Sequence, residues 1–397
     1  MAMLKFAFSL LFPIIINCLF MTGSMAQSQQ GPEELSSLEN LVRFDVSDPS
    51  IPEISFNNPL TFTDPSLIMG QITEVAVDES GRVFVADRDN SSVYMFDKDG
   101  SYATTIGGEG DGPGEFRSLR NIAAGSGYLH AFDMSQRRIT RFDLETLQEA
   151  GTTALSGDEP QTGGFNMSRF PNGFYLMPDG NYLLSFSAFT FPGMGGQSDD
   201  VPMLDFDILT PGGEYLGFEG IELRANESVT SASGNSFRVI MPSYAQKAFT
   251  AVSPDGRIYT NWSEELLVKE YDADGTYQRA FFSEYRKPAI DRDELLASAK
   301  ETYDEASYEL LKEQEFPETW PAVQQLLADD SNRLWIALYT GNDMRKWVVF
   351  NTRSGKPEGV FELPTNHRIQ QVKGEYVYVI EPDSDGFDSV KRYKVKF

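Results

Sequence analysis

Several arginines of this acidic chain gather in its first half, where they could bind an anion. The guanidinium group presents N–H donors in a planar fork that matches a carboxylate or a phosphate. Ordinary surface charge is the alternative, and the sequence alone leaves both interpretations open. The arginines concerned are Arg88, Arg117, Arg120, Arg137 and Arg138.

The chain has two histidines, and both are candidate ligand contacts. His130 occupies a strand position at which equivalent segments carry Phe84, Tyr259 and Trp335. A position shared with aromatic residues favours packing, with metal ligation or general-base chemistry as the alternative. His367 precedes the last repeat and could face a central channel, although a single loop histidine is usually solvated.

No motif assigns a catalytic residue or a metal ligand. Neither a Gly-x-Ser-x-Gly elbow nor a His-Glu-x-x-His pair occurs. Residues 97–100 and 272–275 resemble half of a calcium loop but lack its closing glutamate, which favours hairpin turns. The surplus of acidic residues still permits one Ca²⁺ held by carboxylates of several repeats. Apart from that ion we expect no cofactor.

Composition excludes several classes of function. The 397 residues include 33 Lys+Arg and 59 Asp+Glu, which leaves a net charge of −26. This charge argues against nucleic acid and against an anionic membrane surface as partner. Two histidines and one cysteine exclude a cysteine-rich zinc site, a three-histidine zinc site and a disulfide scaffold. We expect a monomer whose partner is a small ligand or an envelope protein.

The N-terminus, residues 1–26, has the pattern of a cleaved secretory signal peptide. Lys5 precedes an apolar stretch over residues 6–20, and Ser24-Met25-Ala26 fits a cleavage site. A membrane anchor and lipidation at Cys18 are the alternatives. Lipidation would allow peripheral membrane association, but the residues flanking Cys18 fit that signal poorly. We therefore expect an extracytoplasmic protein that is periplasmic, associated with the outer membrane or secreted.

The body of the chain, residues 71–397, is a repeat. Ile72–Gly107 divides into four short apolar runs separated by turns such as Glu79-Ser80-Gly81 and Lys98-Asp99-Gly100. Alternation with such turns is the hairpin signal, and four strands in a meander make one propeller blade. The pattern recurs over residues 119–155, 174–223, 249–285, 323–364 and 368–397. It predicts an all-β protein, a six-bladed β-propeller with a helical insertion behind the signal peptide.

The last repeat has only three strands, so a fourth must come from elsewhere. Residues 27–70 supply it in our prediction, through either 41–46 or 54–62 beside 390–397, because closure removes an exposed sheet edge. An open solenoid is the alternative, but the atypical capping repeats that it needs are not evident.

The first repeat resembles a known family. Gly81-x-Val-Phe-Val-Ala-Asp, Ser92-Val-Tyr-Met-Phe-Asp and the glycine-rich stretch 106–116 resemble the NHL-repeat blade and its interblade loop. Trp320-Pro, Leu334-Trp-Ile and Trp347-Val-Val-Phe are similar to six-bladed propellers of bacterial secreted and lipoprotein type. The resemblance covers residues 71–397. It implies a fold more than an activity, because most such proteins are uncharacterised.

Three insertions interrupt the repeat, at residues 190–200, 225–248 and 288–316. The last predicts one amphipathic helix, N-capped by Asp291 and ended by Phe316-Pro317. We expect it to pack on the side or end of the propeller, with a mobile lid over the channel as the alternative.

The sequence thus favours a binding module that presents loops around a central channel to a small ligand, a glycan or a partner protein. A carboxylate-calcium-dependent lactonase, esterase or lyase is the alternative, and a purely structural envelope protein is a third interpretation.

Overall fold

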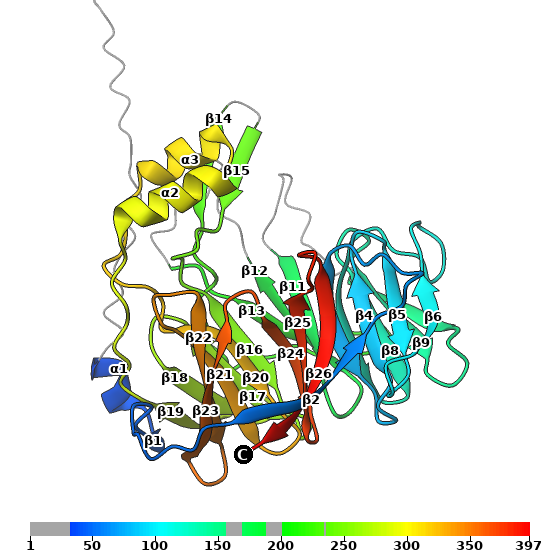
Figure 1. Cartoon of the computed structure of the whole chain (residues 1–397), viewed down its shortest axis with the longest axis horizontal. Helices are drawn as coiled ribbons and strands as arrows, with labels where there is room; N and C mark the ends of the chain where they lie inside the picture. The colour runs from blue at the N-terminus through cyan, green and yellow to red at the C-terminus, as the bar shows by residue number, and fades with distance from the viewer. Residues whose placement is uncertain (1–31, 156–168, 188–200, 234–235) are drawn as a thin grey trace, which may run out of the picture.

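Six of the β-sheets follow one another around a central axis and form a six-bladed β-propeller in this computed structural model. Figure 1 shows the strands of these sheets from the side. The structure describes residues 32–155, 169–187, 201–233 and 236–397. The predicted signal peptide, Cys18 and the whole insertion at 190–200 lie outside these residues. The predicted six-bladed fold is confirmed. Within the described ranges no helix is both long and apolar enough to cross a membrane.

Each blade is an antiparallel meander whose first strand is innermost, and strands follow one another in chain order. Blade one has β3 (Ile72–Val77), β4 (Val83–Asp87), β5 (Ser92–Phe96) and β6 (Tyr102–Gly107); blade two has β7 (Leu119–Gly125), β8 (Tyr128–Asp133), β9 (Arg138–Asp143) and β10 (Glu149–Ala154); blade three has β11 (Phe170–Leu176), β12 (Tyr182–Ser187) and β13 (Asp205–Leu209). Blade four has β16 (Ala248–Val252), β17 (Ile258–Trp262), β18 (Leu267–Tyr271) and β19 (Tyr277–Phe282); blade five has β20 (Val323–Ala328), β21 (Arg333–Tyr339), β22 (Met344–Asn351) and β23 (Lys356–Pro364); blade six has β24 (Arg368–Lys373), β25 (Tyr376–Pro382) and β26 (Asp388–Lys396).

The N-terminal segment completes the ring. Strand β2 (Ser55–Phe62) pairs antiparallel with β26 and places Phe62 opposite Val390. Strand β1 (Leu41–Arg43), which follows the short helix α1 (Pro32–Ser37), runs parallel to β19 at the outer edge of blade four. The two stretches that could have closed the last blade therefore cover two different sheet edges.

The core lies between the blades. The middle strands β4 and β5 are buried at every position, because each blade packs against a neighbour on both faces. One cluster joins blades six and one through Phe62, Val85 and Ile380. Trp335 and Trp347 are fully buried in another cluster between blades five and six.

The predicted single helix is wrong: the structure has two helices, α2 (Arg292–Thr302) and α3 (Glu305–Lys312). Asp291 caps α2 as expected. The chain then turns extended at Tyr303 (φ −108°, ψ 155°), and Asp304 caps α3 by accepting from the N–H of Ser307. Arg238 holds the Asp304 carboxylate at 2.8 Å, and this contact from a distant strand stabilises the break.

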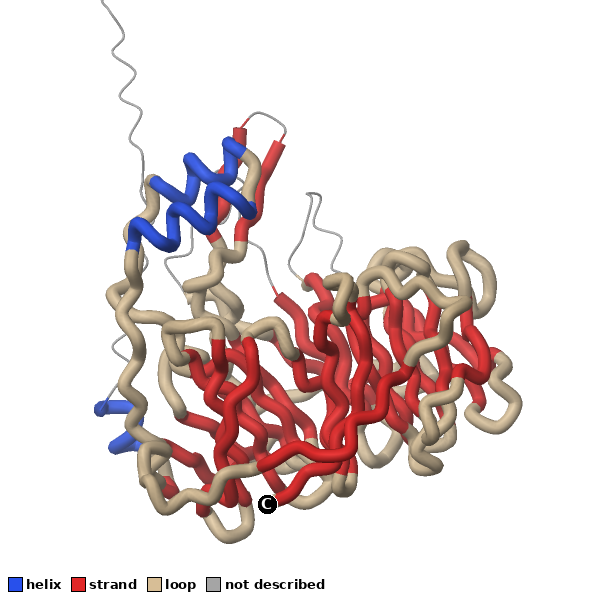
Figure 2. The backbone as a smooth tube through the Cα atoms, in the orientation of Figure 1, coloured by secondary structure: helices blue, strands red, loops and turns tan. Residues whose placement is uncertain are grey.

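Among the described residues, the core that the helices share contains no blade residue, which differs from the expected packing on the propeller. The helices pack on the hairpin formed by β14 (Val229–Ser233) and β15 (Ser236–Ile240), through a small core of Val229, Ile240, Ala299 and Leu311. We call these four elements the inserted module. It stands away from the sheets (Figure 2). Its two halves lie in the connections that lead into β16 and β20, so it belongs to the face at which the inner strands begin.

Candidate functional site: the mouth of the central channel

The six inner strands, β3, β7, β11, β16, β20 and β24, begin at the same end of the channel, which we call the channel mouth. Five of them carry a β-bulge there, with two residues facing one on the neighbouring strand. Bulges redirect side chains and recur beside functional sites. The extra residue is polar in every case: Thr73, Arg120, Asn172, Gln324 and Gln370.

A cavity of about 350 Å³ opens at the mouth between blades six, one and two. Three of the bulge residues, Thr73, Arg120 and Gln370, line it together with Arg88 and Arg368. Arg88 follows β4 and Arg368 opens β24, so three blades each contribute one guanidinium group to this space.

Further cations continue around the mouth. Arg224, at the end of blade three, lines an adjoining cavity with Arg120. Arg345 on β22 interacts electrostatically with Arg368, and Lys247, which precedes β16, interacts with Arg345. Every blade therefore provides one cation at this end of the channel. We call this set the cation ring: Arg88, Arg120, Arg224, Lys247, Arg345 and Arg368.

Part of this positive charge is compensated and part is not. Arg88 lies 4.0 Å from the Asp89 carboxylate, and Arg224 interacts electrostatically with Glu227. Burial and then the neighbouring Arg368 lower the pKa of Arg345, and burial and then Arg345 lower the pKa of Lys247. The Arg345 Nε is buried and has no hydrogen-bond partner among the described residues. Arg368 pairs with Asp388 at 2.6 Å, whereas Arg120 makes no hydrogen bond or ion pair within the part of the chain that the structure describes. Such a site favours negative charge.

The carboxylate of Glu74 lies deeper in the channel. Glu74 on β3 accepts from the Asn121 Nδ2 at 2.8 Å and from the N–H of Ile122 at 3.4 Å. Burial raises the pKa of Glu74 to about 7, and these hydrogen bonds and Arg120 only partly offset it. The channel beneath the ring therefore changes charge near neutral pH.

The structure separates the predicted arginines into two groups. Arg88 and Arg120 meet at the mouth as lining residues of one cavity. Arg117 instead pairs with Asp111 at 2.7 Å on the interblade loop. Arg137 lies in the turn between β8 and β9, where its charge acts on Tyr215 of blade three. Neither Arg117 nor Arg137 belongs to the cation ring.

Neither histidine is among the residues that line the two cavities of the ring, although His367 directly precedes Arg368. His130 is 2 % exposed and packs between blades two and three. Its Nε2–H donates to the Gly125 carbonyl at 3.2 Å, so its Nδ1 accepts from the Tyr182 hydroxyl at 3.0 Å. Burial lowers the pKa of His130 to about 4, which keeps its imidazole neutral. The Nδ1 of His367 lies 3.6 Å from the Glu381 carboxylate in blade six.

Sequence reasoning missed four members of the ring. Lys247 and Arg368 stand at the start of their repeats, as Arg120 does, so an alignment of repeat starts could have found them. Arg224 lies in the irregular connection after β13, where it forms an isolated bridge with Met203, and Arg345 lies on the third strand of its blade. No local sequence pattern marks either residue.

No metal site emerges from the acidic residues that the structure covers: no three His, Cys, Asp or Glu side chains gather there in a group that could hold an ion. The calcium ion stays a prediction.

Comparisons with known proteins agree on the fold. A family described as a 6-bladed beta-propeller, DUF5128, matches residues 50–183, from the closing strand to blade three. A Bacteroides fragilis protein whose name describes it as exported superposes with a TM-score of 0.51 at 12 % identity, covering 90 % of this chain and 100 % of its own. A member of the duf4221 family from Bacteroides vulgatus reaches 0.53 at 12 % identity, covering 87 % and 98 %.

At this identity the two structures show the fold alone. The predicted likeness to six-bladed propellers is confirmed, and its NHL character is compatible with these findings without being shown by them. No curated protein matches the chain in sequence.

Proposed function

We propose that this chain is an exported binding protein that holds a small organic anion at the channel mouth. The observation that carries the proposal is the cation ring, to which all six blades contribute although the chain as a whole is acidic. Like charges held together raise the free energy of the folded protein, and an anion between them lowers it. The signal-peptide pattern and the exported relative from Bacteroides fragilis support export.

The mouth suits carboxylate or phosphate oxygens. Arg88, Arg120 and Arg368 can each offer paired N–H donors to such a group. The bulge residues Thr73 and Gln370 add neutral hydrogen-bonding groups beside them. Glu74 lies below and repels an anion when it is charged, so binding should strengthen as Glu74 takes up its proton.

Calorimetric titration of the purified protein with citrate and with pyrophosphate tests the proposal. We expect one site whose affinity falls as the salt concentration rises, because exposed charges are screened. Arg120→Gln and Arg368→Gln should each weaken binding about 10- to 100-fold, the usual effect of losing a charged hydrogen bond.

Arg117→Gln is the matched control. It removes the same charge from the same face, but Arg117 is paired with Asp111 outside the ring. Equal losses in Arg117→Gln and Arg120→Gln would show only a general charge effect. That result, or no binding of either anion, would overturn the proposal.

A further inference from the structure

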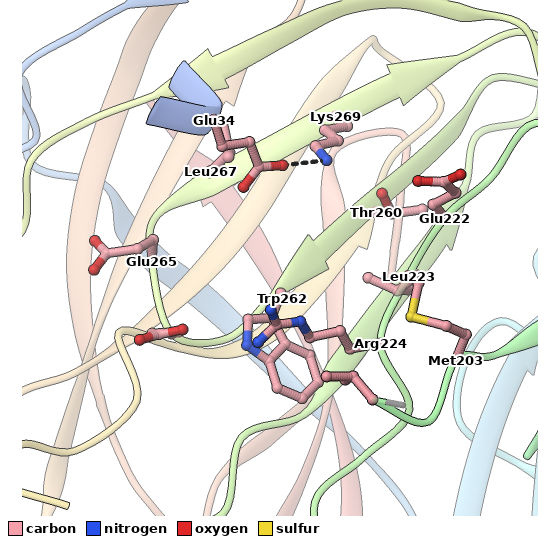
Figure 3. A pocket seen from close by; sticks show the side chains of 12 residues that line it. Glu34, Met203, Glu222, Leu223, Arg224, Thr260, Trp262, Glu265, Leu267 and Lys269 are labelled. Atoms are coloured by element: carbon pink, nitrogen blue, oxygen red, sulfur yellow. Dashed lines mark ion pairs between the residues drawn. The ribbon is translucent and has the colours of Figure 1, made fainter. Parts of the chain in front are cut away.

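A second cavity continues the channel mouth sideways, between blades three and four and the inserted module. It measures about 410 Å³ and shares Arg120 and Met134 with the cavity at the mouth. We call it the side trough. Beyond it, Arg224 and Trp262 also line a third cavity of about 270 Å³ (Figure 3).

The side trough has a larger apolar share of its lining than the mouth, although Arg120, Arg224 and Glu227 also line it. Burial raises the pKa of Glu227, which favours its neutral form. Met241 is 57 % exposed and Val201 is 48 % exposed, and both line it with Pro171 and Met134. Large exposed apolar side chains gathered in one concave place mark binding sites, whereas scattered ones need no explanation. Thioethers such as those of Met134 and Met241 pack well on aromatic rings.

Trp262 supplies an aromatic side chain at the far end. Its Nε1 is buried and has no hydrogen-bond partner among the described residues, although it is a donor. The Arg224 guanidinium lies 5.9 Å from the centre of the indole ring (Figure 3). The far end therefore offers an aromatic surface and a second cation.

The inserted module forms the outer wall. Thr230 and Met241 stand at the base of the hairpin β14–β15 and line the side trough. The Tyr303 hydroxyl, after α2, donates to the Met241 carbonyl at 3.4 Å. The helices thereby hold the end of the hairpin in place, which explains why two insertions far apart in the sequence pack together.

We infer that the ligand is an amphipathic aromatic carboxylate. Its carboxylate binds beside Arg120, and its aromatic body lies in the side trough between Met241 and Trp262. Charge complementarity selects this occupant, because Arg120 stands where the charged and apolar cavities meet. The inference rests on the proposed function and names the class of anion.

Three probes separate the parts of this inference: 2-naphthoate, acetate and the uncharged 2-naphthalenemethanol. In calorimetric titrations 2-naphthoate should bind at least about tenfold more tightly than either of the others, because it alone combines the charge with a buried apolar body. Met241→Ser and Trp262→Phe should each weaken 2-naphthoate about three- to tenfold and leave citrate binding unchanged. Met241→Ser carries little folding risk, since Met241 is exposed. Phe387→Ala, which removes another exposed apolar side chain, is the control and should change neither.

The outcomes distinguish the two proposals. If citrate binding depends on Arg120 and 2-naphthoate binds no better than acetate, the inference is overturned and the proposed function stands. If 2-naphthalenemethanol binds as tightly as 2-naphthoate, the side trough takes an uncharged group, such as a partner's side chain, and the inference fails. If neither citrate nor 2-naphthoate binds, both proposals fall.

Discussion

Arg345 and Arg368 are both positively charged and are close enough at the channel mouth to repel each other, so that burial and then Arg368 lower the pKa of Arg345. They belong to different blades, and only Arg368 has an ion-pair partner, Asp388, among the described residues. Such an arrangement stores unfavourable electrostatic energy in the folded protein, which is common where a site is prepared for an opposite charge.

The pair predicts how anions affect stability. Citrate should raise the melting temperature of the wild-type protein, since a ligand at a hundredfold excess over its Kd stabilises by about 2.7 kcal/mol. Arg345→Gln removes one of the two repelling charges, so without citrate it should have a higher melting temperature than wild type. Citrate should raise the melting temperature of this variant less than that of wild type. Arg345→Lys keeps the charge and should behave like wild type. A lower melting temperature of Arg345→Gln without citrate would contradict the stored repulsion.

Glu74 should make stability fall as the pH rises. Its pKa is about 7 in the folded protein and 4.5 ordinarily, so between these pH values the folded state binds more protons than the unfolded state. The free energy of unfolding therefore falls as the pH rises from 4.5 to 7. Chemical denaturation at pH 5 and pH 8 should show wild type losing on the order of 1–3 kcal/mol more than Glu74→Gln over this interval. Citrate itself gains negative charge between pH 5 and pH 8 in the experiments on both proteins, so its affinity for wild type should fall relative to its affinity for Glu74→Gln. Parallel behaviour of the two proteins would refute the assignment.

His130 should produce the opposite slope at lower pH. Burial depresses its pKa to about 4 from 6.5, so the stability that it contributes is present above pH 6.5 and is lost as the pH falls toward 4. The full effect should be on the order of 3 kcal/mol. An NMR titration of the two imidazoles should find His130 neutral at pH 5.5, and a charged His130 there would show that the side chain is not buried as described.

Closure of the propeller should depend on the side chain of Phe62 in β2. Its ring lies 5.9 Å from that of Phe96 in blade one and 6.2 Å from that of Tyr378 in blade six. Phe62→Ala should lower the free energy of unfolding by about 3–5 kcal/mol, as for other buried aromatic residues. Phe387→Ala removes a side chain that is 61 % exposed and should change it by less than about 0.5 kcal/mol. Denaturant titration measures the free energy of unfolding of both variants. Equal changes in Phe62→Ala and Phe387→Ala would mean that packing of β2 does not stabilise the closed propeller.

The blades could be read from the sequence because their signals are local. A turn such as Glu79-Ser80-Gly81 places Gly81 at φ +87°, which glycine adopts without strain, and the alternating runs on either side pair with each other. The break between α2 and α3 could not be read in this way, because the contact that stabilises it comes from Arg238, 66 residues before Asp304.

The same difference between local signals and long-range contacts applies to the candidate site. The sequence by itself determined six similar hairpin units and a surplus of arginine near the first two, since both follow from residues close together in the chain. Only the tertiary structure decided which cations meet, because ring closure by β2 and β26 brings Arg368 beside Arg88 and Arg120. It also decided that Arg117 points to Asp111 instead. Electrostatic proximity depends on distance in space, and a closed ring joins residues that lie at opposite ends of the chain.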